Sequence, residues 1–593
     1  MSYLTYPFNP DTILRKKKQI KRELLASGHE LSNKRIAILG GSTTAEIKDI
    51  LELFLLHYGI MPEFYESEYA QYWQEGMFGE GLNKFTPDVV FIHTTSRNIQ
   101  LWPNSHNSRE QIDEMLDSQF NHFSSMWEKI KLLCKCIIIQ NNFERPGYRL
   151  FGNKDVSDYR GRSNYVSRLN QKTYEYAQSN KDFYVNDIDY LSASYGLASW
   201  HDPVSWYTYK YALCLSAIPE LSYSVANIIK SVYGKNKKAF ALDLDNTLWG
   251  GVIGEEGMEG IDIGLETPMG QIYSEFQDYI KAHKDLGIIL SICSKNDLKN
   301  ALVGLRHPES VLSADDFAVV KANWENKDFN INEIEQELNI STDSLVLIDD
   351  NPAERDLVLG QIEGVAAPDI GSVEEYIQRI DQSGFFEVTS ISEDDLKRGD
   401  MYKENANREK MRQNFESYLD YLKCLEMVAT IEKIEPVYTQ RIAQLTNKTN
   451  QFNLTTKRYS EREIIAVAED SNYLGLYGKL ADKYGDNGVV SVIIGRINDI
   501  VLHIDLWIMS CRVLKRDMEL AMFDKLVSNA INVGIQKIIG YYYPSAKNSM
   551  VSELYHVLGF DKVSQDEEGN TVWEYLTKNH INKNLVITVL LNE

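Results

Sequence analysis

Two aspartates, separated by one residue, directly follow a short apolar run. The run 239–242 indicates a buried strand, and Asp243, Asp245, Asn246 and Thr247 come just after it. Carboxylates this close raise each other's pKa unless a cation lies between them, and Mg2+ suits hard oxygen ligands with a phosphate partner. With Mg2+ bound, Asp243 could attack phosphorus, and Asp245 could protonate the leaving group and then activate water. The alternative is an Asp-rich turn that caps a helix.

Further along the chain, three more segments offer polar side chains that suit phosphate chemistry. The runs 287–293 and 344–348 indicate strands, and a lysine follows in the motif Asn-Trp-Glu-Asn-Lys. A hydroxyl can bind a phosphoryl oxygen, and a lysine can neutralise the phosphoryl group and the nucleophile together. Ligands of parallel sheets collect at the carboxyl ends of the strands, so we expect one site. The residues are Ser294, Lys295 and Asn296, then Lys327, then Asp349, Asp350 and Asn351.

This ordered set of acid, hydroxyl, lysine and acid resembles the haloacid dehalogenase (HAD) phosphatase superfamily. The resemblance implies a Rossmann-like domain in which Mg2+ is held by Asp243, the backbone carbonyl of Asp245 and either Asp349 or Asp350. The intervals between the motifs are too short for an inserted domain of the usual size. We therefore expect a domain without a large cap (C0 type), in which 250–264 forms at most a hairpin flap.

Length and charge limit the class of protein. At 593 residues the chain is too long for one core, so we expect an α/β multidomain protein of three or four units. The net charge of −23 argues against nucleic acid as a partner. No apolar run approaches the roughly 20 residues that span a bilayer, and no signal peptide is recognisable. We expect a cytoplasmic protein without a membrane partner, and scattered cysteines that stay reduced.

Residues 1–235 alternate short apolar runs with helical patterns. The runs 35–39, 89–93 and 136–140 predict parallel strands of a βαβ sheet, with a helix from about Ala45. This domain forms the first of four predicted divisions.

The Gly-Gly-Ser after the first run resembles the start of the SGNH hydrolase fold, with Ser42 at the nucleophile position. Gly41 stands where that signature has aspartate, and the nearest counterparts of its asparagine and histidine are Asn98 and His201. We therefore expect Ser42 to be a helix cap and the domain to be a scaffold or recognition module.

The next two predicted divisions are the phosphatase domain, 236–385, and a helical linker, 386–425. The run 365–369 is expected to be the last strand of the phosphatase domain. The linker is strongly charged, with Asp395 and Arg408 among its ionised residues, and we expect these to form a solvated face.

Residues 426–593 form the last predicted division, an α+β domain. Strands are expected at 474–480, 488–495 and 501–509, and a helix from Asp517; this order resembles the Gcn5-related acyltransferase (GNAT) fold. Cys511 stands beside Arg512, with Lys515 and Arg516 nearby. Such cations lower a thiol pKa and favour a nucleophilic thiolate, whereas the alternative is a small buried hydrophobic residue.

Several longer motifs together resemble the FkbH-like family: Asp-Leu-Asp-Asn-Thr-Leu-Trp-Gly-Gly, Asn-Trp-x-x-Lys, Ile-Asp-Asp-Asn-Pro, Thr-Asn-Lys-Thr-Asn-Gln-Phe-Asn, Gly-Asp-Asn-Gly and Met-Ser-Cys-Arg. The resemblance implies that phosphate is removed from 1,3-bisphosphoglycerate and that a glyceryl group passes through Cys511 to an acyl carrier protein. We expect the substrate to contact Asn246, Thr247, Lys295, Asn296 and Asn351, together with Asn450, Asp486, Asn487 and Arg512.

Two alternatives to acyl transfer remain. One is a plain Mg2+-dependent phosphatase acting on a phosphorylated metabolite, whose flanking domains serve as caps or scaffolds and in which Cys511 is dispensable. The other is a scaffold protein with degenerate sites.

Overall fold

The computed structural model describes residues 2–28, 31–412, 415–545 and 547–590. The protein is of mixed α/β type and forms two compact units. The first unit comprises residues 1–232 and 387–389, and the second comprises residues 233–386 and 390–593. The division into four domains remains a prediction.

The first unit is built on a parallel sheet of five strands in the order β2-β1-β3-β4-β5. The residues 36–40 of the first strand are buried throughout, which is typical of a parallel strand covered on both faces. The predicted strands of this region are confirmed, with ends shifted by a few residues at most. The strands are β1 (Ser32–Gly40), β2 (Ile60–Glu66), β3 (Val89–His93), β4 (Ile137–Asn141) and β5 (Phe183–Asn186).

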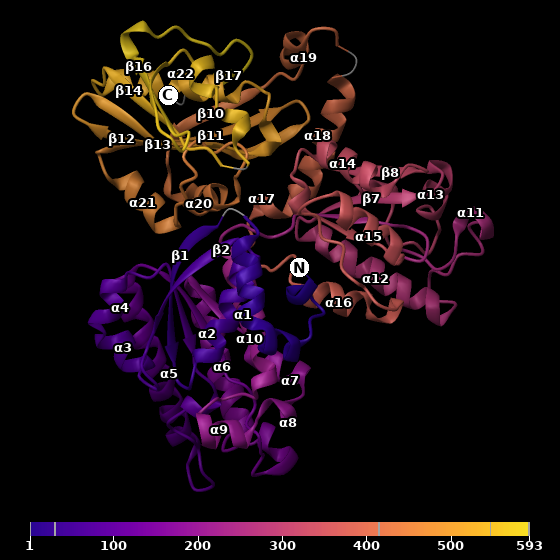
Figure 1. Ribbon diagram of the computed structural model, residues 1–593, viewed down its shortest axis with the longest axis vertical. Coiled ribbons are helices and arrows are strands. Elements are labelled where there is room, and N and C mark those ends of the chain that lie inside the picture. Colours follow the sequence, from indigo (N-terminus) through magenta and orange to yellow (C-terminus); the bar gives the residue numbers. More distant parts are fainter. Residues whose placement is uncertain (1, 29–30, 413–414, 546, 591–593) are drawn as a thin grey trace. The chain divides into compact units, whose positions relative to one another are not determined.

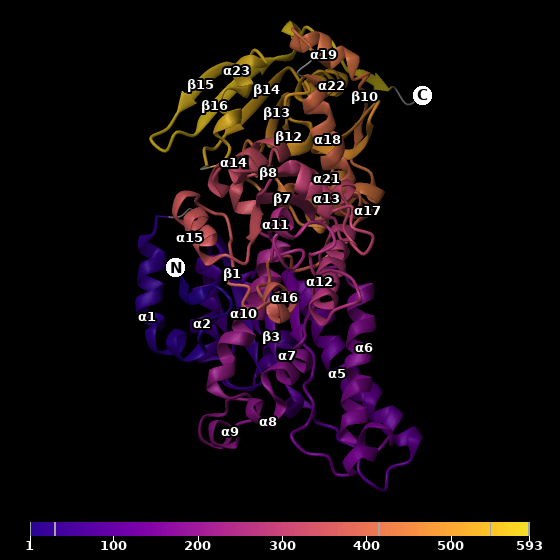
Figure 2. The ribbon, with the colours of Figure 1, turned by 90° about the vertical axis from the view of Figure 1, so that its right-hand side faces the viewer.

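Helices cover both faces of this sheet. Figure 2 shows α1, α2 and α10 on one side of β1 and β3, and α5 and α6 on the other. The helices are α1 (Pro10–Ala26), α2 (Ala45–His57), α3 (Tyr72–Phe78), α4 (Glu80–Phe85), α5 (Arg109–Cys134), α6 (Arg162–Ser179), α7 (Ile188–Tyr195), α8 (Leu197–Trp200), α9 (Pro203–Tyr209) and α10 (Ile218–Val232), with the 3-10 helices η1 (Ser2–Leu4), η2 (Ser96–Asn98), η3 (Gly152–Val156) and η4 (Leu215–Ala217).

The second unit begins with a parallel sheet of four strands in the order β8-β7-β6-β9. Alternate residues of β6 face opposite layers: Phe240 packs with residues of α12 and α16, and Ala241 with residues of α14 and α15. Figure 1 shows β7 of this sheet between α14 and α12. The elements are β6 (Ala239–Leu242), α11 (Ile253–Glu256), α12 (Pro268–Asp285), β7 (Ile289–Lys295), α13 (Leu298–Gly304), η5 (Ala314–Asp316), β8 (Val319–Asn323), α14 (Lys327–Leu338), η6 (Thr342–Ser344), β9 (Leu345–Ile348), α15 (Pro352–Gln361), η7 (Val373–Glu375) and α16 (Tyr376–Gln382).

Helices α17 (Glu393–Leu396), α18 (Arg398–Arg412) and α19 (Tyr418–Cys424) lead to a sheet of eight strands in the order β15-β16-β14-β13-β12-β11-β10-β17. Strands β10 to β13 pair antiparallel in sequence, and β13 and β14 pair parallel. The elements are β10 (Val428–Lys433), η8 (Pro436–Tyr438), α20 (Thr439–Lys448), α21 (Glu461–Glu469), β11 (Tyr473–Asp482), β12 (Gly485–Asn498), β13 (Val501–Met509), η9 (Cys511–Val513), α22 (Met518–Asn532), β14 (Lys537–Tyr542), η10 (Ser549–Val551), α23 (Leu554–Val557), β15 (Asp561–Gln565), β16 (Thr571–Leu576), η11 (Thr577–Asn579) and β17 (Thr588–Leu590).

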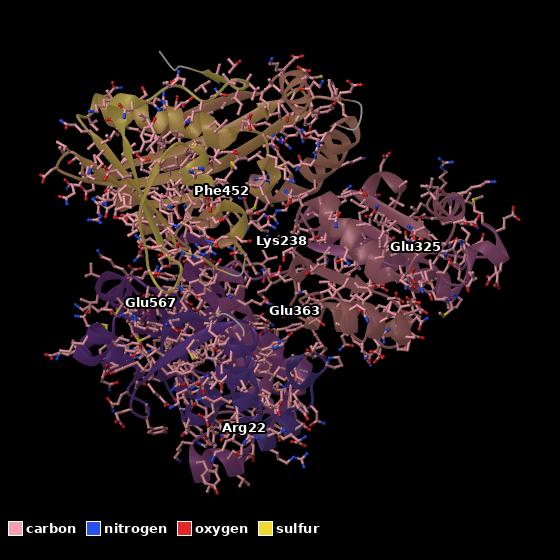
Figure 3. All side chains as sticks on the ribbon, turned by 45° about the horizontal axis from the view of Figure 1, so that its top comes forward. Arg22, Lys238, Glu325, Glu363, Phe452 and Glu567 are labelled. Carbon is pink, nitrogen blue, oxygen red and sulfur yellow. The ribbon has the colours of Figure 1, made fainter. Side chains whose placement is uncertain are left out.

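An extended segment, 452–455, fills the gap between β13 and β14, which pair only over their first three residues. Its start is marked by Phe452 in Figure 3. The backbone N–H of Leu454 donates to the carbonyl of Trp507 at 3.2 Å, and its carbonyl accepts from the N–H of Tyr543 at 2.8 Å. We call this segment the strap. It joins both strands, so the end of the motif Thr-Asn-Lys-Thr-Asn-Gln-Phe-Asn serves to complete the sheet.

Two sequence predictions are wrong. The run 365–369 forms no strand, because Ala366 makes only an isolated bridge to Val346. The charged linker is not a uniformly solvated face: Asp395 is 4% exposed and Arg408 is 1% exposed. Both side chains are ion-paired, which is how buried charges are tolerated.

Among the residues that the structure describes, no helix combines the length and apolar character that crossing a membrane requires.

Candidate active site

The carboxyl edge of the four-stranded sheet carries the polar residues predicted from the sequence. The central strand, β6, ends at Leu242, and its neighbours β7 and β9 are in parallel register with it. Asp243 therefore emerges level with Asp349 on one side and one residue short of Ser294 on the other, and its N–H donates to the carbonyl of Ile348 at 2.9 Å. Parallel pairing thus brings side chains that are more than 100 positions apart in the sequence to one edge of the sheet.

Three carboxylates form the centre of this edge. One oxygen each from Asp243, Asp349 and Asp350 lies within 4.8 Å of the others. Asp243 is 8% exposed and Asp349 is fully buried. Such a cluster is unfavourable unless cations compensate it.

Lys327 supplies part of that compensation. It is the first residue of α14, two residues after Glu325, which Figure 3 labels, and its side chain is 2% exposed. Its Nζ lies 2.8 Å from Asp243 Oδ2 and also donates to Asp349 Oδ2. Burial alone would lower the pKa of Lys327, but the charges of Asp243 and Asp349 outweigh it and raise this pKa above its usual range.

The remaining negative charge fits a divalent cation. Burial and the charge of Asp243 raise the pKa of Asp349 to about 6, although Lys327 acts in the opposite direction. Burial, followed by the charge of Asp243, likewise raises the pKa of Asp350. Three carboxylates and one lysine leave two negative charges in a half-buried space. All-oxygen ligands with this net charge suit Mg2+, and Asp243, Asp349 and Asp350 are the side chains that would hold it.

Ser294 and Asn351 lie beside the carboxylates. Ser294 is 2% exposed and sits near the end of β7, in register with Ala322. Asn351 caps α15: its Oδ1 accepts from the N–H of Ala353 at 3.0 Å, while its own N–H donates to Asp349 Oδ1 at 2.9 Å. The side chain of Asn351 is therefore used by the protein to shape the metal-binding edge.

Other residues expected to contact the substrate also bond within the protein. The buried Thr247 accepts from the N–H of Asp350 at 3.3 Å, so its hydroxyl supports the carboxylate cluster. Asn246 has a positive φ of 55°, and its Oδ1 accepts from Gly251 N at 3.0 Å, which closes the turn. Lys295 pairs with Glu354 at 2.7 Å. These contacts make the three side chains part of the frame around the site.

Asp245 is held by three donors. Its Oδ1 accepts from the indole N–H of Trp249 at 2.9 Å and from the backbone N–H of Ile253 at 3.1 Å. Its Oδ2 accepts from the amide of Asn296 at 2.9 Å. Burial raises the pKa of Asp245, while the bonds from Ile253 and Trp249 act in the opposite direction.

Two residues of this site were missed in the sequence. Arg355 donates through Nη1 to the backbone carbonyls of Asp349 and Asp350, at 2.7 and 2.9 Å. Trp249 follows Asp245 at a spacing of four residues. Only a cation or an indole four to six residues after the aspartates could have indicated them, and such spacings are common.

The structure does not bring Cys511 to the carboxylates. The backbone carbonyl of Cys511 accepts from Asn339 Nδ2 at 2.8 Å, and Asn339 is the C-cap of α14, the helix that starts at Lys327. A helix of 12 residues is about 18 Å long, so Cys511 is placed at the opposite end of α14 from Lys327. Its thiol instead meets the buried hydroxyl of Tyr402, 3.3 Å away on α18.

The cations expected to activate Cys511 point elsewhere. The guanidinium of Arg512 donates to Ser510 Oγ at 3.2 Å and contacts Met401, and Arg516 pairs with Asp482 at 3.1 Å. Lys515 is exposed. None of the three side chains has a hydrogen bond or ion pair to the thiol within the described part of the chain.

The polar residues of the last region bond to their own surroundings. Asn450 accepts from Arg458 at 2.6 Å, and the exposed Asp486 accepts from Gly488 N at 2.8 Å. Asn487 is fully buried and donates to the carbonyl of Leu480 at 3.2 Å. These contacts stabilise the turns and the strap; a substrate role for these residues stays a prediction.

In the first unit, Ser42 is not the helix cap that the sequence predicted. The N-cap of α2 is Thr44, and Ser42 is 2% exposed. Asn98 donates to the carbonyl of Gly41 at 2.9 Å, whereas the ring of His201 contacts the carbonyl of Arg145 at 3.1 Å. The resemblance to SGNH hydrolases stays a prediction.

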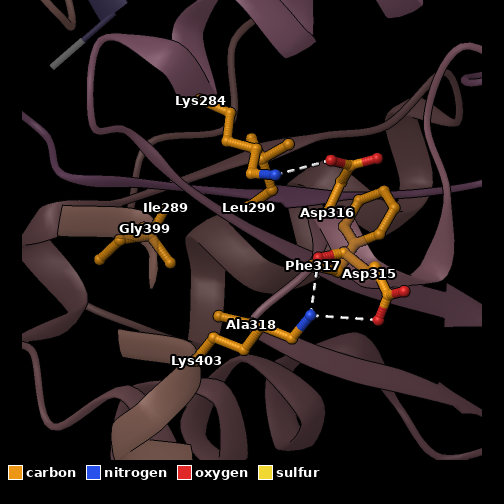
Figure 4. A pocket seen from close by; sticks show the side chains of 9 residues that line it. All are labelled: Lys284, Ile289, Leu290, Asp315, Asp316, Phe317, Ala318, Gly399 and Lys403. Atoms are coloured by element: carbon orange, nitrogen blue, oxygen red, sulfur yellow. Dashed lines mark hydrogen bonds and ion pairs between the residues drawn. The ribbon is translucent and has the colours of Figure 1, made fainter. Parts of the chain in front are cut away.

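A small pocket elsewhere in the second unit is unrelated to the carboxylate cluster (Figure 4). It lies between α18 and the first residues of β7, at the edge opposite Asp243. Its two lysines are neutralised, since Lys284 pairs with Asp316 at 2.6 Å and Lys403 with Asp315 at 3.1 Å. The pocket therefore offers no charge for a phosphorylated ligand.

Comparisons with known proteins relate the chain to a phosphatase. Residues 35–230 match the profile of the FkbH N-terminal domain. The solved N-terminal part of the protein BF1531 from Bacteroides fragilis, described as containing a phosphatase domain complexed with Mg, is 29% identical; it has a TM-score of 0.59, with 64% of this chain and 99% of that chain covered. No curated protein matches the chain.

Two acetyltransferases are also similar in structure. The ribosomal-protein-S18-alanine N-acetyltransferase from Escherichia coli has 13% identity and a TM-score of 0.21, covering 27% of this chain and 99% of its own. A GNAT-family acetyltransferase from Streptococcus pneumoniae has 12% identity and a TM-score of 0.20, covering 25% and 98%. At such TM-scores these likenesses do not establish an acyltransferase function.

Proposed function

We propose that this protein is a Mg2+-dependent phosphatase of the HAD type that uses Asp243 as its nucleophile. The carrying observation is the cluster of Asp243, Asp349 and Asp350 around Lys327 at the carboxyl edge of a parallel sheet. The likeness to a solved protein described as containing a phosphatase domain complexed with Mg supports the same proposal.

The reaction follows from the placement of these side chains. A carboxylate oxygen of Asp243 attacks phosphorus, the bond from phosphorus to the ester oxygen breaks, and Asp245 gives a proton to the leaving oxygen. Water then attacks the phosphorus of the aspartyl phosphate, Asp245 takes its proton, and phosphate leaves as Asp243 is regenerated. When bound by Asp243, Asp349 and Asp350, Mg2+ would supply the positive charge that neutralises the phosphoryl oxygens. Lys327 holds the Asp243 carboxylate in position throughout.

Substituting Asp243 tests the proposal. Asp243→Asn keeps the shape of the side chain but removes the nucleophile, so phosphate release from p-nitrophenyl phosphate should fall to background, and no phosphorylated protein should form. The measurements are phosphate release and the intact mass of acid-quenched protein. Undiminished release by the purified variant would overturn the proposal and favour a scaffold.

A finer proposal couples this chemistry to acyl transfer, from a donor such as 1,3-bisphosphoglycerate through Cys511 to a carrier protein. It rests on the motifs around Cys511 and on the resemblance to the FkbH-like family. The placement of Cys511 and Lys327 at opposite ends of α14, a helix about 18 Å long, weighs against direct transfer, so the geometry favours the phosphatase alone. The carrier partner and the cytoplasmic location also stay predictions.

A further inference from the structure

Asn296 is buried beside the site, with 3% of its surface exposed. Its Oδ1 accepts from the N–H of Asp297 at 2.8 Å, and its Nδ2 donates to Asp245 Oδ2 at 2.9 Å. Because the first bond requires an acceptor and the second a donor, the two ends of the amide cannot be exchanged. The orientation of Asn296 is therefore defined by its bonds.

Of the three donors to Asp245, Asn296 is the one that comes from another strand. Trp249 and Ile253 follow Asp245 by four and eight residues in the segment that leads into α11. Asn296 instead follows β7, next to Ser294 and Lys295. The amide thus ties Asp245 to the neighbouring strand end and fixes its position relative to Asp243.

We propose that Asn296 is a positioning residue for Asp245 rather than a contact for the substrate. This inference rests on the proposed phosphatase function. Without the amide, Oδ2 of Asp245 loses its bond to β7, and the carboxylate can turn about its side-chain torsions. Proton transfer requires an approach of about 2.6–3.2 Å, so such freedom slows both the departure of the leaving group and the attack of water.

The effect is expected in turnover and not in substrate binding. With p-nitrophenyl phosphate and Mg2+, Asn296→Ala in the full chain should lower kcat by about 10- to 100-fold and change KM by no more than about 3-fold. Because p-nitrophenolate leaves with little need of a proton, hydrolysis of the aspartyl phosphate should be slowed more than its formation, and phosphorylated protein should accumulate. Acid quenching followed by intact mass spectrometry measures that fraction.

A double-mutant cycle separates positioning from a structural role. If Asn296 acts through Asp245, adding Asn296→Ala to Asp245→Asn should change kcat by less than about 2-fold. Asn323 offers a matched control, because this amide at the end of β8 bonds to Asn330 at 3.0 Å. Asn323→Ala should be additive with Asp245→Asn. An undiminished effect of Asn296→Ala in the Asp245→Asn background would overturn the inference.

A second variant guards against a folding defect. Asn296→Asp keeps the size of the side chain but replaces the donor with a carboxylate, which repels Asp245. We expect kcat to fall at least as far as in Asn296→Ala, and wild-type turnover by Asn296→Asp would refute positioning. Loss of activity in Asn296→Ala with activity retained in Asp243→Asn would instead refute the phosphatase proposal itself, so the two failures can be told apart.

Discussion

Lys327 carries a charge in one of the least exposed environments of the protein, and the reason is its partners. Its side chain is 2% exposed and lies against Asp243 and Asp349. A lysine so deeply buried would ordinarily lose its proton, but two carboxylates keep it charged. These three ionised side chains therefore stabilise one another, and removing one charge leaves the remaining charges less well compensated.

Replacing Lys327 tests that unit. Lys327→Met leaves buried carboxylates without their internal cation, so the unfolding free energy without metal should fall by about 3–5 kcal/mol. Since the cluster is then more negative, Mg2+ should raise the melting temperature more in the variant than in the wild type. Thermal unfolding with and without Mg2+ measures both effects. As a control, Lys295→Met breaks a partly exposed pair with Glu354 and should cost about 1 kcal/mol or less.

His93 predicts a response to acid in the first unit. It is 1% exposed, and burial lowers its pKa to about 4. In the unfolded chain His93 binds a proton near pH 6.5, whereas in the folded chain it binds one only near pH 4. The folded state therefore has its full stability above about pH 6.5 and loses stability as the pH falls toward 4. The loss amounts to about 3 kcal/mol.

The measurement compares thermal unfolding of wild type and His93→Gln between pH 6.5 and 4. The variant should lose less stability over this interval, by about the amount above. His106→Gln changes an exposed histidine and should behave as the wild type. Equal acid sensitivity in His93→Gln and wild type would contradict the prediction.

At the scale of elements, two helices determine how the parts of the second unit are arranged. Helix α14 carries Lys327 at one end and, at its C-cap, Asn339 next to Cys511, so it holds the two candidate sites apart. Helix α18 brings Arg408 into a buried contact with Asp482, which also pairs with Arg516. The linker is therefore part of the packed unit and not a free connection.

The buried Asp482 pairs with Arg408 of α18 and should contribute far more to the free energy of unfolding than an exposed carboxylate that pairs with the same helix. Asp482→Asn leaves two guanidinium groups buried without their shared anion, so the unfolding free energy should fall by about 3–5 kcal/mol. Asp315 pairs with Lys403 of α18 but is 93% exposed, and Asp315→Asn should cost about 1 kcal/mol or less. Denaturant unfolding of the two variants makes the comparison; similar losses would contradict it.

At the scale of the whole molecule, the chain forms two compact units, and the phosphatase site belongs wholly to the second. That unit also contains Cys511, whose thiol contacts Tyr402 on α18. The carboxylates and this thiol lie toward opposite ends of α14, although both belong to one compact unit. Release of phosphate and loading of Cys511 should be separable.

Intact mass spectrometry after incubation with Mg2+ and 1,3-bisphosphoglycerate tests this separation. We expect phosphate release without a glyceryl adduct, and Cys511→Ala should keep kcat within about 3-fold of the wild type, because Cys511 lies at the end of α14 that is remote from Lys327. An adduct that is present in the wild type and absent from Cys511→Ala would instead establish acyl transfer through this residue.

Much of the fold and of the candidate site could be predicted from local sequence. Strands β3 and β13 have the predicted bounds, because short apolar runs bounded by polar residues are strong local signals. The predictions that are wrong concern features that depend on tertiary contacts. Asp395 and Arg408 look like surface charges in sequence, yet partners distant along the chain bury them. The run 365–369 has the composition of a strand but finds only one bridge at the edge of β9.

The sequence by itself determined which side chains stand at the ends of the strands, since the order of acid, hydroxyl, lysine and acid is a property of the chain. Tertiary structure decided what those side chains touch. The structure bonds Asn296 to Asp245 and places Cys511 at the end of α14 remote from Lys327, while the predicted contact of Asn296 with substrate and the acyl transfer to Cys511 stay predictions. The physical reason is that residue type and spacing define local geometry, whereas distances across a fold depend on how helices pack on a sheet.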